Sequence, residues 1–204
     1  DLPERSLSAL FQRIVEEERV LAGKPIHFIK ENQTHKLLPF LLVAFPEARY
    51  VYLVRDPRDV VASHVATALR SDSVLEATRI WKNDQVDTLI ACSGLMDGKL
   101  QGSERVRVVR YEDLIGTPEE ELYRCCAFLG VEYEPAMKRA HEDPRTQARA
   151  EGIDAWRNLS KPVDGANSGK YKQVLSDKET QYVESLCRDE MQLFSYTADY
   201  PEAS

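Results

Sequence analysis

The chain has 204 residues, and 27 basic against 34 acidic side chains give it a formal net charge of −7 at pH 7. This length suits a single α/β domain, and the acidic balance argues against a general nucleic-acid or anionic-membrane binder. No apolar run approaches the roughly 20 residues of a membrane-spanning helix. The four cysteines lack metal-ligand spacing, and we read them as reduced thiols of a cytoplasmic protein.

In chain order, the first expected element is an amphipathic helix over residues 5–21, in which apolar side chains recur at helical spacing. A short strand over 26–30 follows a Gly-Lys-Pro break. The next expected helix covers about 35–45, with Thr34 or Asn32 as its cap.

The main strand is expected over 49–54, with a helix from about 58 to 69 and a longer helix over 73–97. A second strong strand covers 105–111. Strands separated by helices predict an α/β fold with a mainly parallel sheet flanked by helices.

A helix that Thr117 and Pro118 open is expected to end at Gly130, and a last helix covers about 176–193 with Ser176 or Asp177 as its cap. The residues between these two helices have a less regular pattern, rich in proline and glycine.

The junction between the main strand and its helix is the most informative segment. Arg55 leaves the carboxyl end of the strand, Asp56 can cap the helix, and Pro57 suits its first turn. Ser63 lies about two turns into the helix. Ligands bind beyond the carboxyl ends of strands in open α/β sheets, and an arginine beside a helix N-terminus favours an anion. The plainer alternative is a surface ion-pair cluster.

At these residues the chain resembles the sulfotransferases that use 3'-phosphoadenosine 5'-phosphosulfate (PAPS). The eight-residue spacing of Arg55 and Ser63, and the Asp-Pro-Arg-Asp-Val between them, match that family. The resemblance implies a P-loop NTPase-like sulfotransferase fold. It also implies that Arg55 and Ser63 hold the 3'-phosphate of the nucleotide.

A second motif runs from Val109 to Leu114, with Pro118 and a Phe-Leu-Gly after it. By the same resemblance, Tyr111 lies near the adenine, where a phenol can stack on a base and donate a hydrogen bond. On its own, the motif fits an ordinary strand-end tyrosine equally well.

A third stretch, Lys30 to His35, carries the candidates for catalysis that the resemblance implies. His35 is our first choice for the base that takes the acceptor's proton, and Glu31 is the second. Lys30 would neutralise charge on the transferred group. The stretch departs from the family pattern, because Glu31 follows the lysine and Gln33 stands where proline is common. A solvent-facing His35 is the alternative.

A late loop over 167–172 matches the end of a family motif that closes over the 3'-phosphate, through Gly169, Tyr171 and Lys172. The Arg-Lys-Gly that often begins this motif is absent. Lys170, Lys172 or Arg157 would supply its positive charge, although a plain polar loop has similar odds.

The family's phosphosulfate loop, of the type Pro-Lys-Ser-Gly-Thr-Thr, has no counterpart in the chain. We therefore expect residues 1–204 to form one sulfotransferase domain, as a fragment that lacks the first strand and that loop; a degenerate family member is the alternative.

The expected activity is transfer of a sulfonate group from PAPS to a hydroxyl or amine of a small-molecule or macromolecular acceptor, with adenosine 3',5'-bisphosphate as product and no metal. Residues 66–78 and 132–165 are the expected acceptor-binding loops. Two alternatives remain: a catalytically inactive sulfotransferase-like binding module, and a nucleotide-dependent kinase, which would need a Walker loop and a magnesium-binding acid.

Overall fold

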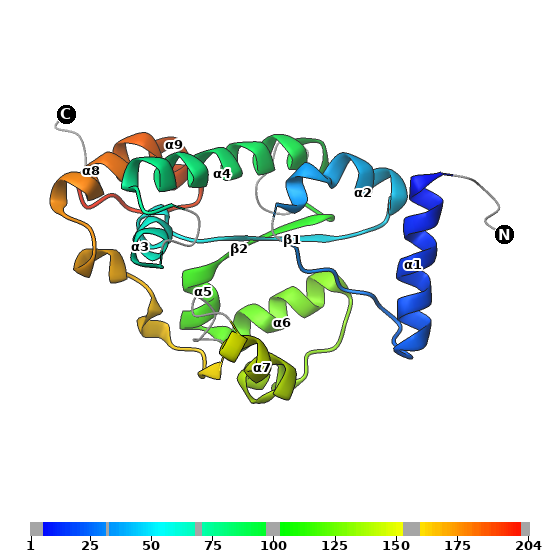
Figure 1. Ribbon diagram of the computed structural model, residues 1–204. Helices are drawn as coiled ribbons and strands as arrows, with labels where there is room; N and C mark the ends of the chain where they lie inside the picture. Colours follow the sequence, from blue (N-terminus) through cyan, green and yellow to red (C-terminus); the bar gives the residue numbers. More distant parts are fainter. Residues whose placement is uncertain (1–5, 32, 68–70, 97–102, 153–159, 201–204) are drawn as a thin grey trace. The chain divides into compact units, whose positions relative to one another are not determined.

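The computed structural model describes residues 6–31, 33–67, 71–96, 103–152 and 160–200. The chain divides into two units, the first built from residues 1–50 and 87–106 and the second from 51–86 and 107–204. In the described residues, strands β1 (Tyr50–Val54) and β2 (Val106–Arg110) form a parallel two-stranded sheet among many helices (Figure 1). The predicted α/β class with parallel strands is confirmed.

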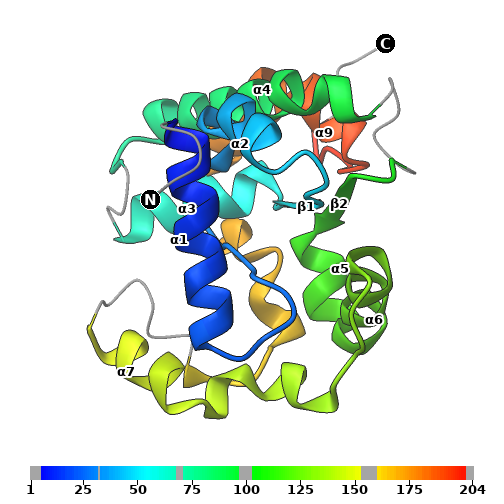
Figure 2. The ribbon, with the colours of Figure 1, turned by 90° about the vertical axis from the view of Figure 1, so that its right-hand side faces the viewer.

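The first unit contains α1 (Leu7–Leu21), the short 3-10 helix η1 (Thr34–Lys36) and α2 (Leu38–Ala44). Helices α1 and α2 lie side by side (Figures 1 and 2), and Phe11 contacts the rings of Phe40 and Phe45 at centroid distances of 5.8 and 5.7 Å. The amphipathic pattern of the first predicted helix therefore buries an aromatic seam against the second.

The predicted strand over 26–30 is wrong, because the structure assigns no strand to these residues. Ile26, Phe28 and Ile29 expose 50%, 67% and 50% of their surfaces. A strand is stabilised by hydrogen bonds to a neighbour and by a buried face, and the described sheet pairs only β1 with β2.

The helix predicted over 35–45 is split into η1 and α2, and Thr34, one of its two predicted caps, does not cap it. The hydroxyl of Thr34 donates to the carbonyl of Glu31 at 2.9 Å, and the alternative cap, Asn32, lies outside the described residues. Helix α2 begins after Leu37 without a side-chain cap and has Pro39 in its first turn, where a missing N–H leaves no intrahelical bond unmade.

In the second unit, β1 runs directly into α3 (Pro57–Thr67). Oδ1 of Asp56 accepts the backbone N–H of Arg58 at 2.9 Å, which confirms the predicted cap. The long helix follows as α4 (Val74–Met96). None of the helices in the part of the chain that the structure describes combines the length and apolarity needed to cross a bilayer.

Strand β2 ends at Arg110, one residue earlier than predicted, and Tyr111 opens the short helix α5 (Tyr111–Gly116). Helix α6 (Pro118–Leu129) follows and ends, as predicted, at Gly130, which has the left-handed φ of 75° that glycine tolerates. Thr117 does not cap α6, because its hydroxyl donates to the carbonyl of Asp113.

The irregular stretch before the last predicted helix contains short helices. The last predicted helix is capped by Ser176 in a capping box with Glu179, as expected, but it is divided at Cys187. The remaining elements are η2 (Pro135–Glu142), α7 (Pro144–Gly152), η4 (Gly165–Asn167), η5 (Lys170–Gln173), α8 (Asp177–Leu186) and α9 (Arg188–Leu193).

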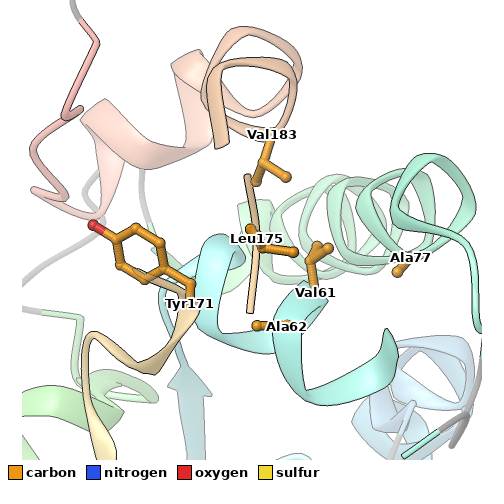
Figure 3. Packing of buried hydrophobic residues seen from close by; sticks show 6 residues of the cluster. All are labelled: Val61, Ala62, Ala77, Tyr171, Leu175 and Val183. Atoms are coloured by element: carbon orange, nitrogen blue, oxygen red, sulfur yellow. The ribbon is translucent and has the colours of Figure 1, made fainter. Parts of the chain in front are cut away.

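A hydrophobic cluster in the second unit holds α3 against η5, α4 and α8. The ring of Tyr171 joins this cluster, while its hydroxyl points away from the aliphatic members (Figure 3). This packing fixes the helix that follows β1, which is the helix expected to carry the anion site. The buried members of the cluster are Val61, Ala62, Ala77, Tyr171, Leu175 and Val183.

Arg58 is the polar counterpart of this cluster. It is 5% exposed and contacts three carboxylates, at 2.7 Å to Asp56, 2.6 Å to Glu184 and 3.6 Å to Asp199. Burial alone would lower the pKa of Arg58, but Asp56, with smaller contributions from Tyr171 and Glu184, holds that pKa above its ordinary value. Arg58 therefore ties α3 to α8 and to the segment after α9.

A second ion-pair cluster, around Glu121, is expected to make the free energy of unfolding depend on pH. Glu121 of α6 accepts from Arg107 of β2 at 3.0 Å and from Arg124 at 2.9 Å. Burial raises the pKa of Glu121, but its bonds to Arg124 and Arg107 outweigh burial and leave the pKa below the ordinary 4.5. A lowered pKa means that the ionised carboxylate stabilises the folded chain above about pH 4.5, and that this stabilisation is lost as the pH falls through the folded-state pKa.

We therefore expect Glu121→Gln to lower the free energy of unfolding at neutral pH and to flatten its decline between about pH 5 and pH 3. Urea unfolding at a series of pH values measures both effects. An equally steep decline in the variant and the wild type would contradict the role given to this carboxylate.

Candidate functional site

The ends of the two strands bring Arg55 and Tyr111 together. Because β1 and β2 are parallel neighbours, the residues that follow them lie at one edge of the sheet. The guanidinium carbon of Arg55 lies 4.6 Å from the centroid of the Tyr111 ring, within the range of a cation–π contact. Two residues that the sequence assigned separately to the nucleotide site are therefore in contact.

Besides the ring of Tyr111, two hydrogen bonds hold Arg55, and one of its donors has no partner among the described residues. Its Nη2 donates to the carbonyl of Asn167 at 2.9 Å, and its own carbonyl accepts from the indole N–H of Trp81 at 3.2 Å. Its Nε is shielded from solvent and donates to no acceptor among the described residues. A buried guanidinium donor without an acceptor is costly, and an anion would satisfy it.

Asn167 belongs to the site, although the sequence analysis did not assign it. Its Nδ2 donates to the hydroxyl of Tyr111 at 2.5 Å, while its carbonyl accepts from Arg55. One residue of the late loop therefore contacts both strand-end side chains. In the sequence, the only indication of this role is that Asn167 is the first residue of the 167–172 loop. That position does not predict which atoms Asn167 contacts.

Ser63 lies on a face of α3 that is directed toward the late loop. Asp59 and Ser63 are four residues apart, so their side chains lie on the same face of the helix. Asp59 accepts the backbone N–H of Gly169 at 2.7 Å and that of Tyr171 at 3.0 Å. Ser63 is partly buried, and its sharing of one anion with Arg55 remains a prediction.

The two loop lysines differ in their surroundings. Lys170 is exposed. The Lys172 ammonium lies 3.3 Å from the carboxylate of Asp199 and 5.6 Å from the centroid of the Tyr171 ring. The hydroxyl of Tyr171, and after it Lys172 and Arg58, lower the pKa of Asp199. Arg157, the third candidate cation, lies outside the described residues.

Glu112 connects three parts of the second unit beside this site. It accepts the backbone N–H of Asp56 at 3.0 Å and the hydroxyl of Tyr196 at 2.8 Å. Burial, reinforced by the carboxylate of Glu112, raises the pKa of the Tyr196 hydroxyl. These bonds hold the exit of β1 and the start of α5 in register at the edge where Arg55 and Tyr111 meet.

The three residues predicted to perform catalysis lie in the first unit. His35 is the second residue of η1. This helix begins directly after Gln33, whose φ is 62°. The imidazole Nε2 of His35 is shielded from solvent and forms no hydrogen bond within the described residues. Lys30 and Glu31 are exposed in the segment before η1. Their catalytic roles remain predictions.

Within the described residues, no three histidine, cysteine, aspartate or glutamate side chains are grouped as metal ligands. The described site at the strand edge consists of the guanidinium of Arg55, the phenol of Tyr111 and the side chain and carbonyl of Asn167.

Comparison with known proteins identifies the family of the chain. A family model described as "Sulfotransferase family" matches residues 3–135. The omega-hydroxy-beta-dihydromenaquinone-9 sulfotransferases Stf3 of Mycobacterium bovis and Mycobacterium tuberculosis are both 36% identical to this chain over 110 residues, which is 50% of this chain and 28% of each relative. The matched stretch thus spans little more than a quarter of these curated relatives.

Solved structures show the same fold. A sulfotransferase domain from the curacin biosynthetic pathway aligns with a TM-score of 0.68 and 22% identity, over 91% of this chain and 68% of that domain. The sulfotransferase domain of the Synechococcus PCC 7002 olefin synthase aligns with a TM-score of 0.63 and 24% identity, over 83% and 56%. With a family model that covers more than half of its residues, this chain belongs to the sulfotransferase family.

Proposed function

We propose that the chain transfers a sulfonate group from PAPS to a hydroxyl, or an amine, of an acceptor. The acceptor oxygen or nitrogen forms a new bond to sulfur as the bond from sulfur to the 5'-phosphate of the nucleotide breaks. The acceptor loses its proton to a base, and adenosine 3',5'-bisphosphate leaves.

The observation that carries this proposal is the environment of Arg55. Its guanidinium lies against the ring of Tyr111 at 4.6 Å, and its buried Nε has no acceptor among the described residues. A nucleotide with a ribose-bound phosphate suits this environment, since the phosphate can accept from the buried Nε of Arg55 and the base can lie against the phenol of Tyr111. Ser63, Lys170 and Lys172 complete the proposed nucleotide site.

The proton transfer is assigned to the first unit. We place His35 as the base, with Glu31 as the second choice, and Lys30 as the cation beside the transferred group. The shielded Nε2 of His35, which has no hydrogen-bond partner in the described residues, supports this order. An imidazole nitrogen without a hydrogen-bond partner in the described residues can accept a proton from an acceptor hydroxyl that reaches it.

A hydroxylated small molecule is the proposed acceptor class. The two mycobacterial relatives are named for an omega-hydroxylated menaquinone derivative, and this favours an alcohol over an amine here. Residues 66–78 and 132–165 remain the proposed acceptor-binding segments. In the described part of them, η2 and α7 supply short helices rather than extended loops.

The test is transfer of label from PAPS carrying sulfur-35. Full-length protein is incubated with the labelled donor and a panel of alcohols, amines, phenols and lipid hydroxyls, and the labelled product and adenosine 3',5'-bisphosphate are quantified together. We expect the two to appear in equal amounts with at least one alcohol.

Two other results would contradict the proposal. Nucleotide binding without transfer to any acceptor would favour the inactive binding module, and label transfer from ATP carrying phosphorus-32 would favour the kinase.

A further inference from the structure

We propose that Asp59 is a positioning residue of the nucleotide site, which acts by fixing the loop that presents Asn167 to Arg55 and Tyr111. This inference rests on the proposed function. Asp59 was not among the site residues predicted from the sequence. It forms no described hydrogen bond to Arg55 or Tyr111.

Asp59 is placed to hold the loop rather than to bind a ligand. It is 2% exposed, and its two carboxylate oxygens accept from two different backbone N–H groups, Gly169 at 2.7 Å and Tyr171 at 3.0 Å. Hydrogen bonds to a charged acceptor are stronger than those between neutral groups. As the third residue of α3, Asp59 also has its charge where the helix dipole favours an anion.

The geometry of the loop explains how the hydrogen bonds to Asp59 also restrict Asn167. Gly169 has a φ of 74°, a left-handed conformation that glycine adopts without strain, and it lies two residues after Asn167. When Asp59 fixes the amides of Gly169 and Tyr171, little freedom remains for Asn167. Its carbonyl then meets Nη2 of Arg55 at 2.9 Å, and its Nδ2 meets the hydroxyl of Tyr111 at 2.5 Å.

These contacts determine the orientation of the Arg55 guanidinium. Arg55 is a long side chain with several rotamers, and the carbonyl of Asn167 and the ring of Tyr111 restrict it to one of them. Binding to a fixed guanidinium avoids the entropy cost of ordering it. Loss of Asp59 should therefore weaken nucleotide binding although the positive charge of Arg55 is unchanged.

The test compares Asp59→Asn with wild type by calorimetry with adenosine 3',5'-bisphosphate. An asparagine keeps the shape but replaces one accepting oxygen by an NH₂ group, so one of the two loop bonds is lost. We expect affinity to fall about tenfold, which corresponds to about 1.4 kcal/mol. In the sulfur-35 assay, the KM for PAPS should rise by a similar factor while kcat changes little.

Glu184→Gln is the matched control. Glu184 is also buried and also accepts two backbone N–H groups, those of Asp199 and Tyr200 at 2.8 and 2.9 Å, but none of its described bonds is to the 167–171 loop. We expect a lower melting temperature with unchanged nucleotide affinity. A double-mutant cycle with Arg55→Ala adds a second readout, because Asp59→Asn should have almost no further effect once the guanidinium is gone.

The outcomes separate this inference from the proposed function. If wild type binds the bisphosphate and Asp59→Asn binds it equally well, or if the two losses in the cycle simply add, the positioning role is wrong and the proposed function stands. If wild type binds no adenosine 3',5'-bisphosphate, both fall.

Discussion

Replacing Arg55 by alanine should weaken the binding of adenosine 3',5'-bisphosphate by about 30-fold or more. The expected loss is about 2 kcal/mol, the size of a charge-assisted hydrogen bond removed from a shielded site. The physical reason is the guanidinium of Arg55, whose Nε is buried without an acceptor in the described residues and whose plane lies against Tyr111. Isothermal titration calorimetry gives the affinity directly.

Two further variants make this result specific. Arg145→Ala removes an arginine whose side chain is 90% exposed and paired with Asp143, so it should leave affinity unchanged. Arg55→Lys keeps the charge but loses the planar fork, and it should bind with intermediate affinity. Unchanged affinity in Arg55→Ala would remove the nucleotide assignment from this edge of the sheet.

Replacing His35 by alanine should reduce turnover by a factor of roughly 10² to 10⁴, the usual contribution of a general base, while nucleotide affinity stays close to that of wild type. Arg55 and Tyr111, not His35, are proposed to hold the nucleotide, so the loss should appear in kcat and not in binding. The sulfur-35 transfer assay under saturating PAPS and acceptor measures kcat, and calorimetry measures affinity in the same preparation.

His27→Ala is the matched control, since His27 also lies in the first unit, 3.6 Å from the carboxylate of Glu18, and has no proposed role. It should keep full activity. Glu31→Ala decides between the two candidate bases: if it abolishes turnover and His35→Ala does not, the base is Glu31.

The sequence was most informative where local chemistry determines structure. At the junction of β1 and α3, an apolar run, a capping aspartate and a proline each favour the same local conformation, and Asp56 caps the helix as expected. Because the end of a parallel strand is also where ligands bind, the same residues that define this junction indicated the candidate site.

The failures have a different physical origin. Residues 26–30 contain Ile26, Phe28 and Ile29, which have high strand propensity, but strand formation depends on a neighbouring strand that a local pattern does not contain. Asn167 and Asp59 owe their importance to contacts with residues more than 100 positions away in the sequence. Residue spacing and secondary-structure propensity do not predict such contacts. Only the structure therefore shows the side chains that orient Arg55.

The motif that begins at Arg55 contains a second arginine only three residues later, and the two guanidinium groups have opposite electrostatic consequences. Arg58 lies among the carboxylates of Asp56, Glu184 and Asp199, so this group of four side chains carries a formal charge of −2 near neutral pH. It would repel a polyanionic nucleotide rather than attract it. The number of arginines in such a motif therefore overstates the electrostatic attraction for the nucleotide. We expect loss of Arg58 to weaken the packing of α3 against α8 rather than the binding of the donor.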